Sequence, residues 1–351
     1  MRLDQLDTPA LLLDLDAMEQ NLAKMAAFFA HGPTRLRPHY KNHKSPVLAR
    51  RQLDAGAIGM TCATLSEAEA LVSNGITDIL LSTELAGEPK IRRFADLARQ
   101  GEVKAVVDNA KAAAALGAEA RARDQALQVL VNVNVGQNRT GITPGKSAAE
   151  LAQQARAQGL KVRGLMGYEG HLGHLPDGPE KEKAYGEAMG TLMECRSLVE
   201  ARGIPVEVVS AGGTGTYKLS SRFPQITESQ AGSYLLMDTN YASTCKDFER
   251  ALTVLTTVIS KTGEERVVVD AGLKSISGEL GMPVLKSRDG LHLRKLNAEH
   301  GVIDIVGPHA SLEVGDRVEI WVQYSDATVN LHDCMYGIRN GIVEEVLMLH
   351  G

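Results

Sequence analysis

Residues 78–109 read DILLSTELAGEPKIRRFADLARQGEVKAVVDN, and they contain the unit from which the fold is predicted. Two short β-type runs, DILLST at 78–83 and VKAVVDN at 103–109, flank the helical stretch KIRRFADLARQG. This stretch ends in glycine with a basic residue in its last turn, which is typical of a helix C-terminus. Strand, helix and strand in this order predict two parallel strands joined by a crossover helix.

The same alternation extends along most of the chain. The predicted strands are 35–40, 57–64, 78–83, 103–109, 127–135, 162–170, 206–213 and 229–238, with helix-forming segments between most neighbours. Eight parallel strands predict an α/β fold, a (β/α)8 TIM barrel over about residues 10–238. An open doubly wound sheet is the alternative. We favour the barrel because the chemically suggestive residues follow different strand ends, which meet at one face of a barrel.

Beyond residue 238 the pattern changes. The runs at 251–262, 265–272, 301–306, 316–324 and 341–349 are β-rich, and helical periodicity is weak. They predict a second, mostly antiparallel β-domain, formed by residues 1–9 and 239–351. The segment TPALLLDL at 8–15 could pair with this domain.

Composition narrows the class of function. The formal net charge is −5, from 38 Lys and Arg against 43 Asp and Glu, and no basic block occurs. Nucleic acid and membrane are therefore not expected as partners. We find no signal-peptide pattern and no apolar run of the ~18 residues that a membrane span needs. The four cysteines form no CxxC pair, so a cytoplasmic protein without a disulfide framework is expected.

Two glycine-rich loops follow the predicted seventh and eighth strands. SAGGTGTYK at 210–218 allows backbone N–H groups to approach an anion, and its hydroxyls add donors. QAGSY at 230–234 places Gly232, Ser233 and Tyr234 beside it. These loops are the usual phosphate site of a barrel. A tight turn without a ligand is the alternative.

The loops after the predicted fifth and sixth strands carry further polar side chains. Arg139, in NVGQNRTGI, suits a donor to an anionic or phenolic oxygen, unless it is a surface arginine. GYEGHLGH at 167–174 offers Tyr168, Glu169, His171 and His174. Either histidine could act as a general acid or base; simple exposure is the alternative.

RPHYKNHKSP at 37–46 ends the first predicted barrel strand. Period-two alternation puts Arg37, His39 and Lys41 on one face, with Lys41 pointing into the barrel mouth. Lys44 lies nearer the next helix. A lysine beside a phosphate site can attach a cofactor aldehyde covalently, and desolvation together with His39 would lower its pKa. Solvated lysines are the alternative.

These motifs together resemble those of one family. RPHYKNHK, GQNRTG, GGTG, QAGSY, DAGLKS and NLHD are similar to motifs of the D-threonine aldolase and D-serine dehydratase group. These are fold-type III pyridoxal-phosphate enzymes, related to alanine racemases. The resemblance runs from DTPALLLDL to NLHD and implies a barrel with a β-domain, a homodimer, and pyridoxal 5'-phosphate on Lys41.

The resemblance also implies the residues that hold the cofactor. It places Arg139 at the phenolic oxygen of the cofactor and Tyr241, in MDTNY, near its ring. The other expected cofactor-binding residues are His39, Tyr168, Thr214, Gly215, Gly232, Ser233 and Tyr234, with the phosphate on Thr214, Gly215, Gly232 and Ser233.

The tail departs from this family where a metal pair, His-x-Asp or His-x-Cys, precedes the NLHD motif. Alignment of QYSDATVNLHDC on NLHD puts Tyr324 and Asp326 at the two ligand positions. A phenol is a poor ligand for Mn²⁺ or Mg²⁺, whereas a carboxylate suits them. Asp326, with help from His332, could still hold a hydrated ion; a metal-free site is the alternative.

The resemblance implies a carbon–carbon lyase that cleaves a D-3-hydroxy amino acid into glycine and an aldehyde. Candidates for the base at the hydroxyl are His171, His174 and Tyr324. The alternatives are a dehydratase that releases ammonia, and a racemase with Lys41 and Tyr324 on opposite faces of the substrate. A non-catalytic pyridoxal-phosphate binder is disfavoured because such proteins typically lack a β-domain.

Overall fold

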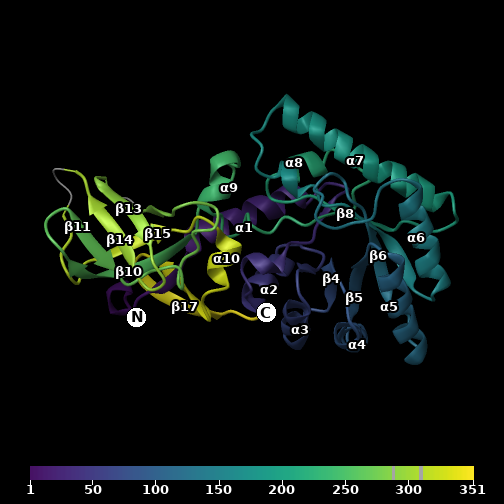
Figure 1. Cartoon of the computed structure of the whole chain (residues 1–351), viewed down its shortest axis with the longest axis horizontal. Helices are drawn as coiled ribbons and strands as arrows, with labels where there is room; N and C mark the ends of the chain where they lie inside the picture. Colours follow the sequence, from purple (N-terminus) through teal and green to yellow (C-terminus); the bar gives the residue numbers. More distant parts are fainter. Residues whose placement is uncertain (287–288, 308–310) are drawn as a thin grey trace. The chain divides into compact units, whose positions relative to one another are not determined.

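The computed structural model describes residues 1–286, 289–307 and 311–351 (Figure 1). The chain forms two compact units. The β-unit comprises Met1–Lys24, Asn42–Val47 and Ser233–His350, and the barrel unit comprises Met25–Lys41, Leu48–Gly232 and Gly351.

The barrel unit contains an eight-stranded parallel sheet in the order β2-β9-β8-β7-β6-β5-β4-β3. Its strands are β2 Arg35–Leu36, β3 Met60–Cys62, β4 Asp78–Glu84, β5 Glu102–Val107, β6 Gln128–Asn132, β7 Lys161–Met166, β8 Val208–Ala211 and β9 Glu228–Ser229. Ile58 N donates to Leu36 O and Thr61 N to Pro38 O, each at 2.9 Å, so β2 also joins β3. The sheet therefore closes, which confirms the predicted TIM barrel.

Helices alternate with these strands, as the sequence predicted. They are α1 Leu15–Phe29, α2 Pro46–Asp54, α3 Leu65–Ser73, α4 Glu88–Leu97, α5 Ala110–Ala122, α6 Lys146–Ala157, α7 Pro179–Glu200 and α8 Tyr217–Ser220. Side-chain caps fix two of the starts: Thr64 Oγ1 accepts from Glu67 N at 3.1 Å, and Asn109 Oδ1 from Ala112 N at 2.8 Å. Such caps satisfy amides that a helix leaves unpaired.

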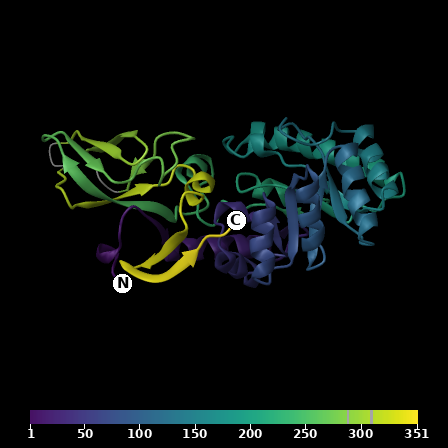
Figure 2. The same cartoon turned by 60° about the horizontal axis from the view of Figure 1, so that its bottom comes forward.

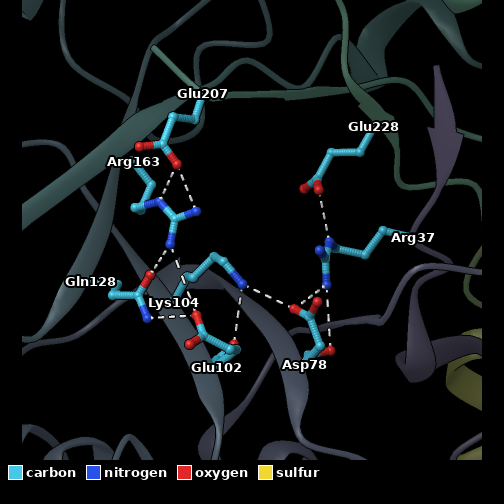
Figure 3. A network of polar contacts seen from close by, with 8 residues as sticks. All are labelled: Arg37, Asp78, Glu102, Lys104, Gln128, Arg163, Glu207 and Glu228. Atoms are coloured by element: carbon cyan, nitrogen blue, oxygen red, sulfur yellow. Dashed lines mark hydrogen bonds and ion pairs between the residues drawn. The ribbon is translucent and has the colours of Figure 1, made fainter. Parts of the chain in front are cut away.

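The interior of the barrel is layered. A middle layer of Leu80, Val106, Leu130 and Met166, packed against Val208, fills the centre. Below it, at the N-terminal strand ends, lies a polar network that runs from Glu228 through Arg37, Asp78, Lys104, Glu102 and Gln128 to Arg163 and Glu207 (Figure 3). The layer toward the C-terminal strand ends is also polar, and it is the layer that faces the expected site.

Arg37 is the most enclosed cation of this network. Its Nε donates to Glu228 Oε2 at 2.9 Å and its Nη1 to Asp78 Oδ1 at 2.8 Å, and the Arg37 and Glu228 side chains are each only 4% exposed. Burial alone would raise the pKa of Asp78, but Arg37 and Lys104 outweigh burial and lower it. Because Arg37 follows β2 directly, these pairs tie the shortest part of the barrel to β9 and β4.

The β-unit contains a mostly antiparallel sheet. Its strands are β1 Ala10–Asp14, β10 Leu252–Lys261, β11 Arg266–Val269, β12 Val284–Leu285, β13 Leu291–Leu296, β14 Gly301–Ile305, β15 Arg317–Trp321, β16 Cys334–Arg339 and β17 Ile342–Met348. The short helices α9 Thr239–Thr244 and α10 Ser325–Val329 accompany them. The N-terminus lies beside β17, to which Arg2 forms a bridge at Ile342 (Figure 2).

The two units divide the chain differently from the expected boundaries at residues 10 and 238. Ala10–Leu13 pair antiparallel with Leu252–Leu255, so β1 belongs to the β-unit, as the possible pairing of TPALLLDL suggested. Residues 42–47 and 233–238 also group with the β-unit. Among the residues that the structure describes, no helix combines the length and apolar character needed to cross a membrane.

Replacing Arg37 by methionine keeps most of the side-chain volume but leaves Glu228 buried without its cation. We expect the free energy of unfolding to fall by about 3–5 kcal/mol, because breaking a buried pair leaves an uncompensated charge. Urea titration followed by circular dichroism measures the change. Arg93→Met is the matched control, since its pair with Glu69 is exposed and such pairs contribute about 0–1 kcal/mol. Equal losses in the two variants would contradict this account.

Candidate active site

Loops that follow β6, β7 and β8 come together at the C-terminal strand ends. The guanidinium of Arg139, in the loop after β6, lies 5.9 Å from the ring centroid of Tyr168, which follows β7. A Cβ built on Gly213, after β8, would lie 3.3 Å from the Tyr168 ring, so this ring packs on the glycine backbone. His171 lies against the loop after β6, because a Cβ on Gly136 would be 3.1 Å from its ring. The structure thus brings together residues that the sequence scatters over three loops.

The turn after β8 is held from within by Glu169. Gly212 N donates to Glu169 Oε2 at 3.1 Å, and Thr216 Oγ1 donates to Glu169 Oε1 at 2.6 Å. Gly213 N in turn donates to Thr216 Oγ1 at 3.0 Å. Glu169 is 1% exposed, and burial raises its pKa although these hydrogen bonds oppose the rise.

Two backbone amides in the predicted phosphate site have no hydrogen-bond acceptor among the described residues. Within the described residues, neither Gly215 N nor Gly232 N donates a hydrogen bond, and Gly232 is buried. Gly215 is half-buried, whereas the amide of Gly232 is buried, and buried backbone donors are nearly always paired in a folded protein. The loops that carry them follow neighbouring strands, β8 and β9. These donors fit the phosphate of pyridoxal phosphate, and no Cβ is tolerated at either position, where it would lie 1.9 Å from Gly173 O or 2.6 Å from His39 O.

Lys41 does not lie in a strand, which corrects the sequence prediction. The strand β2 ends at Leu36, and Lys41 lies in the 3₁₀ turn η2, Tyr40–Asn42. Strand alternation therefore does not decide where its side chain points. Pro38 provides one physical reason, since it has no N–H for a strand ladder. Lys41 is half-buried between Tyr40 and Asn42, which are 0% and 1% exposed.

Both ring nitrogens of His39 lie within hydrogen-bond distance of a neighbouring group. Its Nδ1 accepts the backbone N–H of Lys41 at 3.5 Å, and its Nε2 lies 3.3 Å from Ser82 Oγ. Ser82 Oγ donates its own proton to Cys62 O at 3.0 Å. His39 thus contacts the backbone of Lys41 through one ring nitrogen and Ser82 through the other.

Tyr324 and Asp326 belong to a second cluster, which lies in the β-unit. Tyr324 is half-buried and directly precedes α10, without a capping hydrogen bond from its side chain. Asn42, the residue after Lys41, donates from Nδ2 to Asp326 Oδ1 at 3.0 Å and to Ser325 Oγ at 2.7 Å. The N–H and the hydroxyl of Ser325 both donate to Asp238 Oδ2 at 2.8 Å. Asn42 and Asp238 thus hold the two residues that directly follow Tyr324.

The remaining predicted residues are placed as follows. His332 Nε2 donates to Ser275 O at 2.7 Å, so this nitrogen faces a carbonyl rather than an ion. Tyr234 is fully buried, and its ring lies 5.7 Å from that of Phe248. Tyr241 lies in α9, Ser233 follows the barrel unit, and His174 lies in the loop before α7. Thr214, 2% exposed, lies in the turn that Glu169 holds.

The structure adds residues to which the sequence analysis gave no role. Glu169 was visible in the GYEGH motif, but only the fold shows that it holds the turn after β8. Asn42 and Asp238 could have been noticed as polar residues beside Lys41 and Tyr241, but their partner Ser325 is more than 80 residues from either along the chain. In the parts of the chain that are described, no three His, Cys, Asp or Glu side chains gather in a metal-binding arrangement.

Comparison with known proteins identifies the family. The model of the alanine racemase N-terminal domain matches residues 13–240, and a serine dehydratase domain model matches residues 251–338. The chain belongs to the alanine racemase N-terminal domain family. Within this family it is 36% identical to D-threonine aldolase of Arthrobacter sp, over 98% of this chain and 92% of that one. The resemblance seen in the sequence is thereby confirmed.

Other members of the family differ in substrate or reaction. The 3-hydroxy-D-aspartate aldolase of Paracoccus denitrificans is 35% identical over 97% of this chain and 91% of its own. The D-threo-3-hydroxyaspartate dehydratase of Delftia sp. is 31% identical over 89% and 87%. The crystal structure of D-threonine aldolase from Filomicrobium marinum superposes with a TM-score of 0.95 at 36% identity, covering 99% of this chain and 96% of that one.

A methyl group at Gly215 would meet Gly173 O at 1.9 Å, so the turn has to move in Gly215→Ala. We expect the dissociation constant for pyridoxal phosphate to rise by at least about tenfold, since overpacking of this kind costs about 1–3 kcal/mol. Gly190→Ala is the control, because Gly190 lies in α7 with nothing within 4 Å of the new methyl group. Absorbance titration with the cofactor measures both. Wild-type affinity in Gly215→Ala would contradict the assignment of this turn.

Proposed function

We propose that this chain is a pyridoxal-phosphate-dependent aldolase that cleaves D-3-hydroxy amino acids to glycine and an aldehyde. The observation that carries the proposal is identity of 35–36% to two aldolases along nearly the whole chain, in both units. The substrate class is supported by the names of these relatives, D-threonine aldolase and 3-hydroxy-D-aspartate aldolase. The homodimer and the cytoplasmic location expected from the sequence stay predictions.

The chain offers residues of the right chemistry for each part of the cofactor. The amides of Gly215 and Gly232 suit the phosphate, Arg139 suits an anionic ring oxygen, and Lys41 suits covalent attachment of the aldehyde. When bound, pyridoxal phosphate stabilises negative charge at the substrate Cα. His39 holds the backbone of Lys41 through its Nδ1 and so limits the positions that the lysine side chain can reach.

Cleavage breaks the Cα–Cβ bond of the substrate. The β-carbon leaves as the aldehyde carbonyl once its hydroxyl loses a proton, and Cα gains a proton to become glycine. We assign the acceptance of the hydroxyl proton to Tyr324, which stands where the resembling family has a metal-binding histidine. Asn42 and Asp238 position Tyr324 by holding the next residues, Ser325 and Asp326. His171 and His174 remain alternative bases.

Two further reactions use the same residues on other bonds. The similarity to the Delftia dehydratase supports elimination of the β-hydroxyl, which would yield an oxoacid and ammonia. Racemisation would require Lys41 and Tyr324 on opposite faces of Cα. The decisive assay incubates the cofactor-loaded protein with D-threonine, D-3-hydroxyaspartate and D-serine and measures aldehyde, glycine and ammonia together. Release of ammonia without glycine would contradict the aldolase proposal and support the dehydratase. Exchange of the Cα proton in D₂O without cleavage would support the racemase.

Arginine cannot replace lysine in covalent attachment of an aldehyde, because its guanidinium stays charged. Lys41→Arg should therefore lose the absorbance band of the bound cofactor and all aldehyde release. Lys44→Arg is the matched control three residues away, and it should retain both properties because Lys44 Nζ bonds Asn330 Oδ1 of the β-unit at 2.5 Å and arginine can also donate to that oxygen. Loss of the band in Lys44→Arg alone would transfer the role to that lysine.

Removing the Tyr324 hydroxyl tests the base directly. Tyr324→Phe should lower kcat for aldehyde release by about 10²–10⁴-fold, the usual contribution of a positioned acid–base group, and leave the cofactor absorbance unchanged. Tyr324→His should make activity respond to Mn²⁺ and to EDTA, because imidazole and carboxylate both bind such ions. The control is wild-type protein assayed with EDTA, which should stay active. EDTA-sensitive wild-type activity would instead favour a metal on Asp326.

A further inference from the structure

The carboxylate of Glu169 is buried without a cation beside it. Its side chain is 1% exposed, and within the described residues no Lys, Arg or His forms an ion pair with it. Burying a charged or polar group is unfavourable unless hydrogen bonds compensate. Both of the bonds that its oxygens accept come from the glycine-rich turn after β8, from Gly212 N at 3.1 Å and from Thr216 Oγ1 at 2.6 Å.

Thr216 extends this hold to the next residue of the turn. Its hydroxyl accepts from Gly213 N at 3.0 Å while it donates to Glu169. Gly212 has φ +80°, a left-handed conformation that favours glycine, and a Cβ there would meet Ser229 Oγ at 2.8 Å. The consecutive amides of residues 212 and 213 are therefore both committed, directly or through one hydroxyl, to the same carboxyl group.

The amide of Gly215 is left for another acceptor. No described residue accepts from Gly215 N, and the turn cannot retreat because Gly215 already packs on the backbone of Gly173. Burial raises the pKa of Glu169, and the hydrogen bonds from Thr216 and Gly212 oppose that rise. A turn with two amides held inward and one unpaired donor is preorganised for an anion without further movement.

We propose that Glu169 is a positioning residue for the phosphate group of the cofactor, acting through Thr216 and Gly212 to preset the amide of Gly215. The inference rests on the proposed use of pyridoxal phosphate and adds a role for residues outside the expected cofactor contacts. It requires that Glu169 and Thr216 affect binding of the phosphate while covalent attachment at Lys41 is left intact.

The test compares two ligands that differ only in the phosphate, pyridoxal phosphate and pyridoxal. Dissociation constants are measured by absorbance titration of the full chain. Thr216→Val, which keeps the shape but removes the hydroxyl, should weaken pyridoxal phosphate by about tenfold, or about 1.4 kcal/mol, and change pyridoxal by less than about twofold. Thr216→Ser should bind both ligands as the wild type does. Glu169→Gln should also raise the dissociation constant of pyridoxal phosphate more than that of pyridoxal.

Thr34→Val is the matched structural control. Thr34 is 0% exposed in the same unit, and its hydroxyl donates to Ile226 O at 2.9 Å, so its loss should leave the ratio of the two constants unchanged. Equal weakening of both ligands in Thr216→Val, or unchanged binding of pyridoxal phosphate, would overturn the proposal. A wild type that binds the cofactor but cleaves no amino acid would refute the aldolase and leave this inference standing.

Discussion

Closure of the barrel depends on a strand of two residues. β2, Arg35–Leu36, lies between β9 and β3, and its link to β3 consists of hydrogen bonds from Ile58 and Thr61 rather than a full ladder. The ion pairs of Arg37 with Glu228 and Asp78 secure this weak point from inside. The chain continues from β2 to His39 and Lys41, so the same pairs also fix the strand that precedes the turn of Lys41.

The barrel places charge at both ends of its interior for different reasons. At the N-terminal strand ends, anions and cations alternate, so each buried charge has a partner of opposite sign (Figure 3). At the C-terminal ends, Glu169 has hydrogen bonds but no cation in the described chain. A paired charge stabilises a strand junction, whereas a carboxyl group bonded only to a loop fixes the conformation of that loop.

The β-unit carries Tyr324 and the residues that hold the peptide after it. Tyr324 occupies a position where the family resemblance expects a metal ligand, and the peptide beside it is anchored by Asp238 and Asn42. Asn42 directly follows Lys41, so a covalent neighbour of the lysine bonds the segment that holds Tyr324.

The sequence alone determined the alternation of strands and helices, the number of barrel strands, the β-rich tail and the lysine with its glycine-rich loops, because these depend on local periodicity and composition. Only the tertiary structure decided that Lys41 lies in a 3₁₀ turn, that β1 pairs with β10, and that Glu169 holds the turn at Gly212 and Thr216. Each of these depends on partners distant along the chain, such as Leu252–Leu255 for β1. Local patterns carry no information about which distant group satisfies a buried hydrogen bond.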